Sequence, residues 1–424
     1  MCFYLLTKVW EGERVVMKEI IREYLNNSFA NYVEDLKTIT NIDSGHGDRE
    51  GTEKVNKFVG AKMEALGATT EYRYNSESCH LISRLKGRGK YTILLVAHVD
   101  TVFKRGEAAR RPFRLDENNF AWGPGVGDDK ATVIQVIYSL EALKKAGFDN
   151  YKEIIYYTNG EEEGGSPTAE AIVAELSQQS DFAIIMDVAR PNWGIVTQRK
   201  GNAKYHVEVK GIGGHHGNAS QSCANAIHQL AYTITELHKL ASPMPGDPAD
   251  FTAAALEARG IVDAGQFIPE NTVNVGAIGS TNTMISVIPG DAYCDVNIRG
   301  YKIEELRRLD AAVKALEQKI VIAGTSVKIT GGIVTGPMQK NAKSQKMIDV
   351  YKRIVKEEFG AEVNEWVAGG LTDGNRTAKY VPTLDALGVE NYDEHSDHES
   401  VDLNTAMPRA IAFAMTLAEL AEVF

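Results

Sequence analysis

The sequence predicts an α/β protein that carries a smaller α+β domain as an insertion. Helical and strand patterns alternate from about residue 50, which is typical of a sheet covered by helices. Near residue 201 the pattern changes to half-polar strands, and near residue 333 long helical and apolar patterns return. We therefore expect residues 1–201 and 333–424 to form one domain and residues 202–332 to form the inserted domain. A chain of 424 residues, 43% of them hydrophobic, is long enough for both domains to bury a core.

The first domain contains short apolar runs that alternate with amphipathic runs. Continuously apolar segments predict strands buried on both faces of a sheet. These segments are 91–100 ("YTILLVAHVD"), 153–159 ("EIIYYTN") and 181–187 ("DFAIIMD"). Apolar residues at helical spacing predict helices over 52–67, 131–147 and 168–176. Ser166 and Pro167 are typical of the N-cap and first turn of the last of these helices.

The inserted domain begins with alternating polar and apolar residues, the pattern of a strand with one exposed face. Further segments follow in the order helix, strand, strand, helix, strand. All six segments together are 202–211, 225–241, 272–280, 291–300, 303–320 and 326–332. This order predicts a ferredoxin-like α+β unit.

Charge and composition exclude several classes of partner. The formal net charge of −11 and the pI near 5.5 argue against nucleic acid, because phosphate binding needs a basic surface. We expect a small molecule or a peptide as the partner. No apolar stretch approaches the roughly 20 residues that span a bilayer, and a secretory signal is not recognisable, so we expect a soluble protein without a membrane partner.

The four cysteines, Cys2, Cys79, Cys223 and Cys294, have no paired spacing, which favours reduced thiols and a cytoplasmic location.

Acidic and imidazole side chains recur where the predicted strands of the first domain end. They are His98 and Asp100 in "AHVD", Asp128 and Asp129 in "GPGVGDDKA", Glu161, Glu162 and Glu163 in "GEEEGG", and Asp187 after the strand 181–187. Ligands of open α/β sheets bind at this edge. Each feature taken singly is more typical of a capped strand end, a tight turn with a helix cap or a solvated acidic loop.

Taken together, these side chains supply the donors of a metal site. His98, Asp128, Glu163 and Asp187, with His395 from "YDEHSDHE", provide two imidazoles and three carboxylates without a thiolate. This set suits zinc, with manganese or cobalt as alternatives. Two ions become plausible if one carboxylate bridges them.

The order of the motifs resembles that of a known enzyme family. The motifs are "HVDTV", "GPGVGDDK", "GEEEGGS", a strand-terminal Asp187, "GIGGHHGN", "GGLTDG" and "HSDHESV". This series is similar to that of the dinuclear zinc exopeptidases and amidases, a family that includes glutamate carboxypeptidase, peptidase T, acetylornithine deacetylase and aminoacylase. The resemblance begins near residue 40 and is strongest to the glutamate carboxypeptidase branch. It implies a catalytic domain with a mixed sheet and an inserted lid or dimerisation domain.

The resemblance also implies how the metal ligands are shared. His98 and Asp187 match ligands of one zinc ion, and Glu163 and His395 match ligands of the other. Asp128 matches the carboxylate that bridges the two ions. The peptide bond that follows this residue, between positions 128 and 129, is expected to be cis.

Three further residues match catalytic positions of the family. Glu162 matches the general base, and Asp100 matches the residue that orients His98. His215, on the inserted domain, matches a donor to the reaction oxyanion that reaches the partner's site in a homodimer formed through residues 202–332. Without the resemblance, His215 is more typical of a surface histidine.

Substrate contacts are the last expectation drawn from the resemblance. Arg299 and the segment "GGLTDG", with Gly370 and Thr372, match positions that hold a substrate carboxylate. Arg376 resembles the peptidase T branch. Two departures are Ser286, where the family often has asparagine, and the segment "VTGPMQKN", which lacks the arginine expected of an enzyme that releases C-terminal glutamate.

The activity implied is hydrolysis of an amide bond adjacent to a free carboxylate, by a carboxypeptidase or an N-acyl-amino-acid hydrolase with two zinc ions per chain. Two alternatives stay open. One is a di- or tripeptide aminopeptidase, and the other is an inactive, metal-loaded module that binds peptides.

Overall fold

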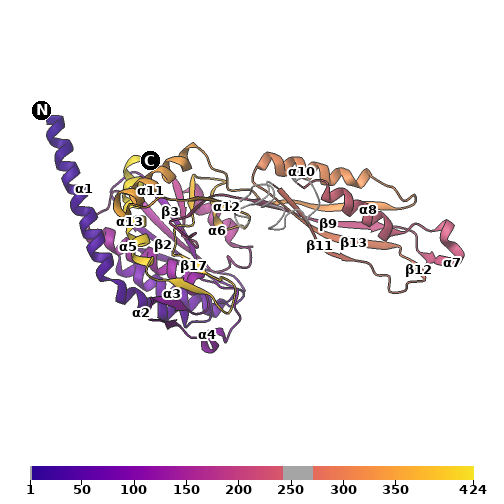
Figure 1. Ribbon diagram of the computed structural model, residues 1–424, viewed down its shortest axis with the longest axis horizontal. Helices are drawn as coiled ribbons and strands as arrows, with labels where there is room; N and C mark the ends of the chain where they lie inside the picture. The colour runs from indigo at the N-terminus through magenta and orange to yellow at the C-terminus, as the bar shows by residue number, and fades with distance from the viewer. Residues whose placement is uncertain (1, 242–270) are drawn as a thin grey trace. The chain divides into compact units, whose positions relative to one another are not determined.

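The computed structural model describes residues 2–241 and 271–424, and the chain divides into two compact units (Figure 1). Unit 1 comprises Met1–Thr197, Lys340–Trp366 and Thr372–Phe424, and unit 2 comprises Gln198–Gln339 and Val367–Leu371. The insertion expected at 202–332 falls inside unit 2, whose bounds are wider by a few residues at each end. Residues 367–371 also belong to unit 2, which the sequence did not predict.

Unit 1 is built on a mixed sheet of eight strands. The order is β1-β2-β6-β3-β7-β16-β8-β15. The bounds are β1 Thr69–Tyr74, β2 Cys79–Lys86, β3 Thr92–His98, β6 Glu153–Asn159, β7 Phe182–Ile185, β8 Ile195–Arg199, β15 Glu365–Ala368 and β16 Thr383–Asp385. The four central strands β6, β3, β7 and β16 are parallel, whereas β1 and β2 are antiparallel additions. The expected α/β class with a mixed sheet is confirmed.

The central strands are buried throughout because helices cover both faces of the sheet. The helices of the larger core are α1 Cys2–Asn27, α2 Phe29–Thr40, α3 Arg49–Ala65, α5 Ala131–Lys145, α11 Ala342–Phe359 and α13 Ala406–Val423. A smaller core on the other face contains α6 Ala169–Gln178, which α12 Asp373–Thr377 contacts. Alternate residues of β3 enter the two cores, Leu95 the larger and Leu94 the smaller. This alternation explains why the strand reads as one continuous apolar run.

A second, small sheet of unit 1 lies in segments for which the sequence predicted no strands. Its order is β17-β18-β5-β4, with β4 Arg114–Leu115, β5 Phe120–Trp122, β17 Asn391–Tyr392 and β18 Ser400–Asp402. Pairing of β18 with β5 joins the segment before the loop 123–130 to the C-terminal segment that carries His395. This sheet therefore brings together motifs that are more than 250 residues apart in the chain.

Unit 2 has the predicted ferredoxin-like arrangement. Its antiparallel sheet has the order β11-β13-β9-β14, with β9 Gly201–Lys210, β11 Asn271–Gly279, β13 Asp291–Gly300 and β14 Ser326–Thr335. The helices α8 Ala226–His238 and α10 Ile303–Ala315 pack on one face of this sheet (Figure 1). The core between them and the sheet contains Val207, Leu230 and Leu309. β10 Gly214–His215 pairs with β12 Val287–Ile288 in a two-strand ribbon, and the short α7 His216–Ala219 directly follows β10. Among the helices that the structure describes, none is long and apolar enough to cross a membrane.

Candidate active site

Three of the five predicted ligands lie at or just after the ends of neighbouring strands of the large sheet. His98 is the last residue of β3, and Asp187 follows β7 by two residues. The loop "GEEEGG" follows β6, which pairs in parallel with β3. Because parallel neighbours end at the same edge, the fold brings these side chains to one place.

The carboxylate of Asp128 lies between two imidazoles. Its Oδ1 is 2.9 Å from His98 Nε2, and its Oδ2 is 3.2 Å from His395 Nε2. His395 Nε2 is also 3.1 Å from Glu163 Oε1. The donor atoms form two groups, each within 4.8 Å, and Asp128 belongs to both. One group adds His98 and Asp187, and the other adds Glu163 and His395.

This arrangement fits a pair of divalent cations. Burial acts to raise the pKa of Asp128, but hydrogen bonds from His395 and His98 hold that pKa below its usual value. The same carboxylates, Asp128 and Glu163, raise the pKa of His395 to about 11. Burial raises the pKa of Glu163. Carboxylate and imidazole donors this close together are the donors that zinc-like divalent cations prefer, and such cations would offset the repulsion among the carboxylates.

Contacts with Asp100 orient the His98 ring as a metal ligand would be oriented. Its Nδ1 lies 3.1 Å from the backbone oxygen of Asp100 and 3.5 Å from the Asp100 carboxylate. A proton on Nδ1 donates to that backbone oxygen, which leaves Nε2 free as a ligand atom. The buried Asp100 carboxylate accepts from the backbone N–H groups of Glu162 and Glu163, both at 2.9 Å. Asp100 therefore links the end of β3 to the glutamate loop.

A residue without a predicted role, Glu399, organises the loop that carries Asp128. Its carboxylate accepts from the N–H groups of Gly125, Gly127 and Asp128 at 2.8–3.0 Å. Burial raises the pKa of Glu399 to about 7. The only signal in the sequence is its position within "HSDHESV". The peptide bond between Asp128 and Asp129 is cis, as the resemblance implies.

The three adjacent glutamates have three different environments. Glu161 is buried, and its Oε1 accepts from the N–H groups of Thr168 and Ala169 at the start of α6. Glu162 is partly buried, and desolvation raises its pKa well above the usual value. Glu163 contacts His395. The repulsion expected of three neighbouring carboxylates is thus reduced because each one faces different partners.

The expected N-cap at Ser166 is wrong. The helix α6 begins at Ala169, and Ser166 Oγ instead accepts from Asn159 Nδ2 at 2.9 Å. The Glu161 carboxylate satisfies the first N–H groups of the helix. A capping group from outside the usual sequence window explains the error.

The expected substrate residues of unit 1 have internal partners. Thr372 is the buried N-cap of α12, and its Oγ1 donates to Asp385 at 3.1 Å. Arg376 is also buried, and its guanidinium donates to the backbone oxygen of Gly165 at 2.6 Å and to Asp373 at 3.2 Å. These contacts attach the glutamate loop to α12.

The remaining predicted residues lie in unit 2. His215 is an exposed residue of β10, opposite Val287, and Gly370 is exposed as well. Arg299 donates to the backbone oxygen of Gly369 at 2.8 Å and to Asn297 Oδ1 at 3.2 Å. It lines a cavity of about 650 Å³ on the face of the sheet that α8 and α10 leave open.

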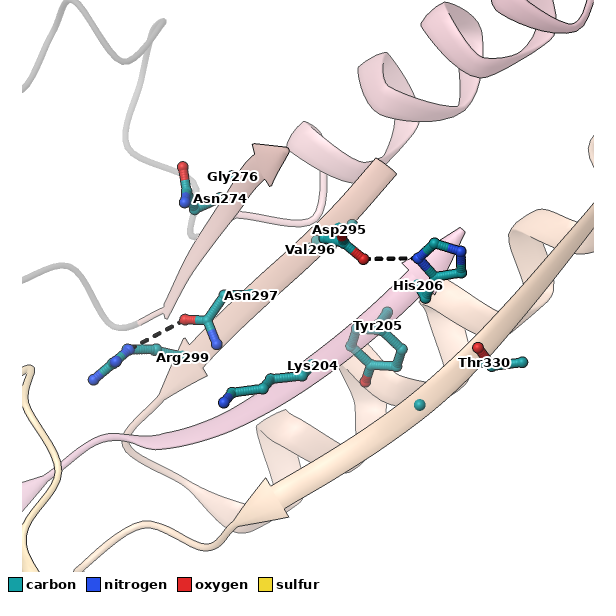
Figure 2. A pocket seen from close by; sticks show the side chains of 11 residues that line it. Lys204, Tyr205, His206, Asn274, Gly276, Asp295, Val296, Asn297, Arg299 and Thr330 are labelled. Atoms are coloured by element: carbon teal, nitrogen blue, oxygen red, sulfur yellow. Dashed lines mark hydrogen bonds and ion pairs between the residues drawn. The ribbon is translucent and has the colours of Figure 1, made fainter. Parts of the chain in front are cut away.

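Figure 2 shows this cavity, with Lys204 on β9, Asn297 and Arg299 on the neighbouring β13, and the hydrogen bond between His206 and Asp295 further along the sheet. The Asn297 contact holds the guanidinium over the sheet. Lys204 and Arg299 place two cationic groups at one end of the cavity.

Comparison with known proteins places the chain in a family. The model of peptidase family M20/M25/M40 matches residues 94–420. Carboxypeptidase G2 of Pseudomonas sp. (strain RS-16) is 26% identical over 396 residues, which cover 91% of this chain and 88% of that protein. The crystal structure of aminopeptidase PepT from Bacillus cereus superposes with a TM-score of 0.71 at 19% identity, covering 95% of this chain and 99% of that one.

A second solved structure is the YxeP protein of Bacillus subtilis, described as a dinuclear metal-binding peptidase of the M20 family. It superposes with a TM-score of 0.66 at 11% identity and covers 94% of this chain and 99% of that one. These TM-scores show that the chain shares the fold of both structures. The family expected from the motifs is confirmed by the match over residues 94–420. The chain therefore belongs to peptidase family M20/M25/M40 and is a metal-dependent hydrolase of amide bonds.

Proposed function

We propose that the chain hydrolyses an amide bond adjacent to a free carboxylate in small peptides or N-acyl amino acids, and that it uses two zinc ions, with manganese or cobalt as alternatives. The observation that carries the proposal is the Asp128 carboxylate, which turns one oxygen toward His98 and the other toward His395. Asp187 and Glu163 complete the two donor groups. The similarity to carboxypeptidase G2 supports an activity of this class.

In this proposal His98 and Asp187 would hold one ion, Glu163 and His395 would hold the other, and Asp128 would contribute to both. When bound, the ions supply Lewis acidity, which lowers the pKa of water and polarises the carbonyl group of the substrate. The chain itself supplies orientation, because Asp100 fixes both the His98 ring and the backbone of Glu163.

Glu162 is proposed as the general base. It accepts a proton from the attacking water and passes that proton to the nitrogen of the leaving amine. One observation supports this role. The Asp100 carboxylate accepts from the backbone N–H of Glu162 at 2.9 Å and so holds this residue next to the proposed ligand Glu163.

The substrate carboxylate is proposed to bind Arg299, with backbone N–H groups near Gly370 as further donors. Support comes from the cationic end of the cavity in Figure 2, where Arg299 is held by Asn297 and the Lys204 side chain is exposed. We do not propose Thr372 and Arg376 as substrate contacts, because both side chains are buried. Their hydrogen bonds instead suit a role in holding α12 and the glutamate loop in place.

A homodimer formed through unit 2 is part of the proposal, with His215 donating to the oxyanion in the partner's site. The edge strand β11 exposes Ile278, and the segment after it exposes Met284 and Ile285. An exposed apolar edge of this kind favours pairing with another chain. A cytoplasmic location is also proposed, and the free thiols of Cys79 and Cys294 support it.

A substrate panel tests the proposed function. Three dipeptides of one sequence are compared: the N-acetyl form, its C-terminal amide, and the form with a free amine. We expect kcat/KM for the N-acetyl form to exceed that of its C-terminal amide by about tenfold or more, because hydrogen bonds to a charged group are lost in the amide. Faster hydrolysis of the free-amine form would instead support an aminopeptidase. Binding of all three forms without hydrolysis in the metal-loaded protein would support a peptide-binding module.

A further inference from the structure

A buried histidine lies beneath the glutamate loop, outside the metal ligands. His80 is in β2, and its residue is 1% exposed. Its Nδ1 lies 3.2 Å from the backbone N of Gly160 and 2.9 Å from the hydroxyl of Tyr157. Its Nε2 lies 3.0 Å from Ser78 Oγ. Both ring nitrogens therefore have partners.

These contacts fix the tautomer of His80. A backbone N–H can only donate, so Nδ1 must accept from Gly160 and carries no proton. The ring proton is then on Nε2 and donates to Ser78 Oγ. The Ser78 hydroxyl in turn donates to Glu161 Oε2 at 3.3 Å. Burial lowers the pKa of His80, which agrees with a neutral ring.

The chain of contacts ends on the two residues that precede Glu162. The backbone N–H of Gly160 donates directly to His80 Nδ1. The Glu161 carboxylate accepts from Ser78, which is the partner of His80 Nε2. A Cβ atom at Gly160 would lie 2.2 Å from the backbone oxygen of Cys79, so only glycine allows the loop to approach β2 this closely. On the other side of the loop, Asp100 holds the N–H group of Glu162.

We infer that His80 is a positioning residue for the general base. Its Nδ1 holds the backbone at Gly160, and this contact fixes where the Glu162 carboxyl lies. The inference rests on the proposed role of Glu162. It has a physical basis, because a misplacement of about 1 Å costs a catalytic group up to about a hundredfold in rate. A neutral imidazole suits this position because one ring both accepts from Gly160 and donates to Ser78.

Two substitutions test the roles of the two ring nitrogens of His80 separately. In His80→Asn the amide oxygen can take the place of Nδ1 and accept from Gly160, whereas in His80→Gln the longer amide reaches only the place of Nε2, near Ser78. Steady-state kinetics are measured on the metal-loaded enzyme. We expect kcat to stay within about threefold of wild type in His80→Asn and to fall about tenfold or more in His80→Gln, with KM nearly unchanged in both. Elemental analysis should find the wild-type metal content in both variants.

Backbone hydrogen exchange gives a readout that does not depend on activity. Amides of the loop 159–166 should exchange faster in His80→Gln than in wild type or His80→Asn. If wild type hydrolyses no amide but this difference in exchange is present, the proposed function fails and the positioning contact stands. Equal kcat and equal exchange in the two variants would overturn the inference. A loss of metal or a raised KM in His80→Gln would also overturn it, because the histidine would then support the site in general.

Discussion

Glu162→Gln is expected to lower kcat by about a hundredfold or more while the metal content stays at the wild-type value. Glutamine keeps the size of the side chain and its backbone contact with Asp100, but it cannot accept a proton from water. Because Glu162 belongs to neither group of metal donors, its replacement removes no ligand. The measurement is steady-state kinetics on the substrate panel, with elemental analysis of the same samples.

Two matched variants accompany this test. Glu170→Gln changes an exposed carboxylate in the first turn of α6 and should leave kcat and metal content unchanged. Glu163→Ala removes a proposed ligand and should lower the metal content. A loss of metal in Glu162→Gln would contradict the assignment of the base, because it would show Glu162 to be a ligand.

Mixing two inactive variants, Glu162→Ala and His215→Ala, should restore up to about a quarter of wild-type activity after subunit exchange. Random pairing makes about half of the dimers mixed. In a mixed dimer one site combines its own Glu162 with the partner's His215, and the other site lacks both. The result follows from the proposal that His215 acts in the partner's site.

The control mixture pairs Glu162→Ala with His395→Ala. Both residues belong to unit 1, so every site in a mixed dimer lacks one of them and activity should not return. Subunit exchange is verified by native mass measurement of the mixed species. If exchange occurs and the first mixture stays inactive, His215 acts within its own chain or has no catalytic role.

The elements predicted well from sequence are those with a strong local pattern. The strand expected at 153–159 is observed as β6 Glu153–Asn159, and the strand expected at 291–300 is observed as β13 Asp291–Gly300. Continuous burial and strict alternation each leave a clear signature. The strands β17 and β18 are two and three residues long, so their pairing depends on distant segments and leaves no such signature.

In the candidate site, too, some features could be predicted from the sequence and others could not. The convergence of His98, Glu163 and Asp187 could be predicted, because each lies at or just after the end of a strand of one sheet and these ends meet at one edge. The cap that Glu161 provides for α6 could not be predicted, since it comes from seven residues before the helix N-cap. His80 has no signal in the sequence, because its role depends on the pairing of β2 with β6.

The central claim is that Asp128 is shared by two metal ions, and a zinc titration tests it most directly. Chelated protein is titrated with zinc while bound metal and hydrolysis of an N-acetyl dipeptide are measured together. We expect two zinc ions per chain in wild type, one in His395→Ala, and no hydrolysis before metal is added. A single zinc ion per chain in fully active wild type would contradict the claim.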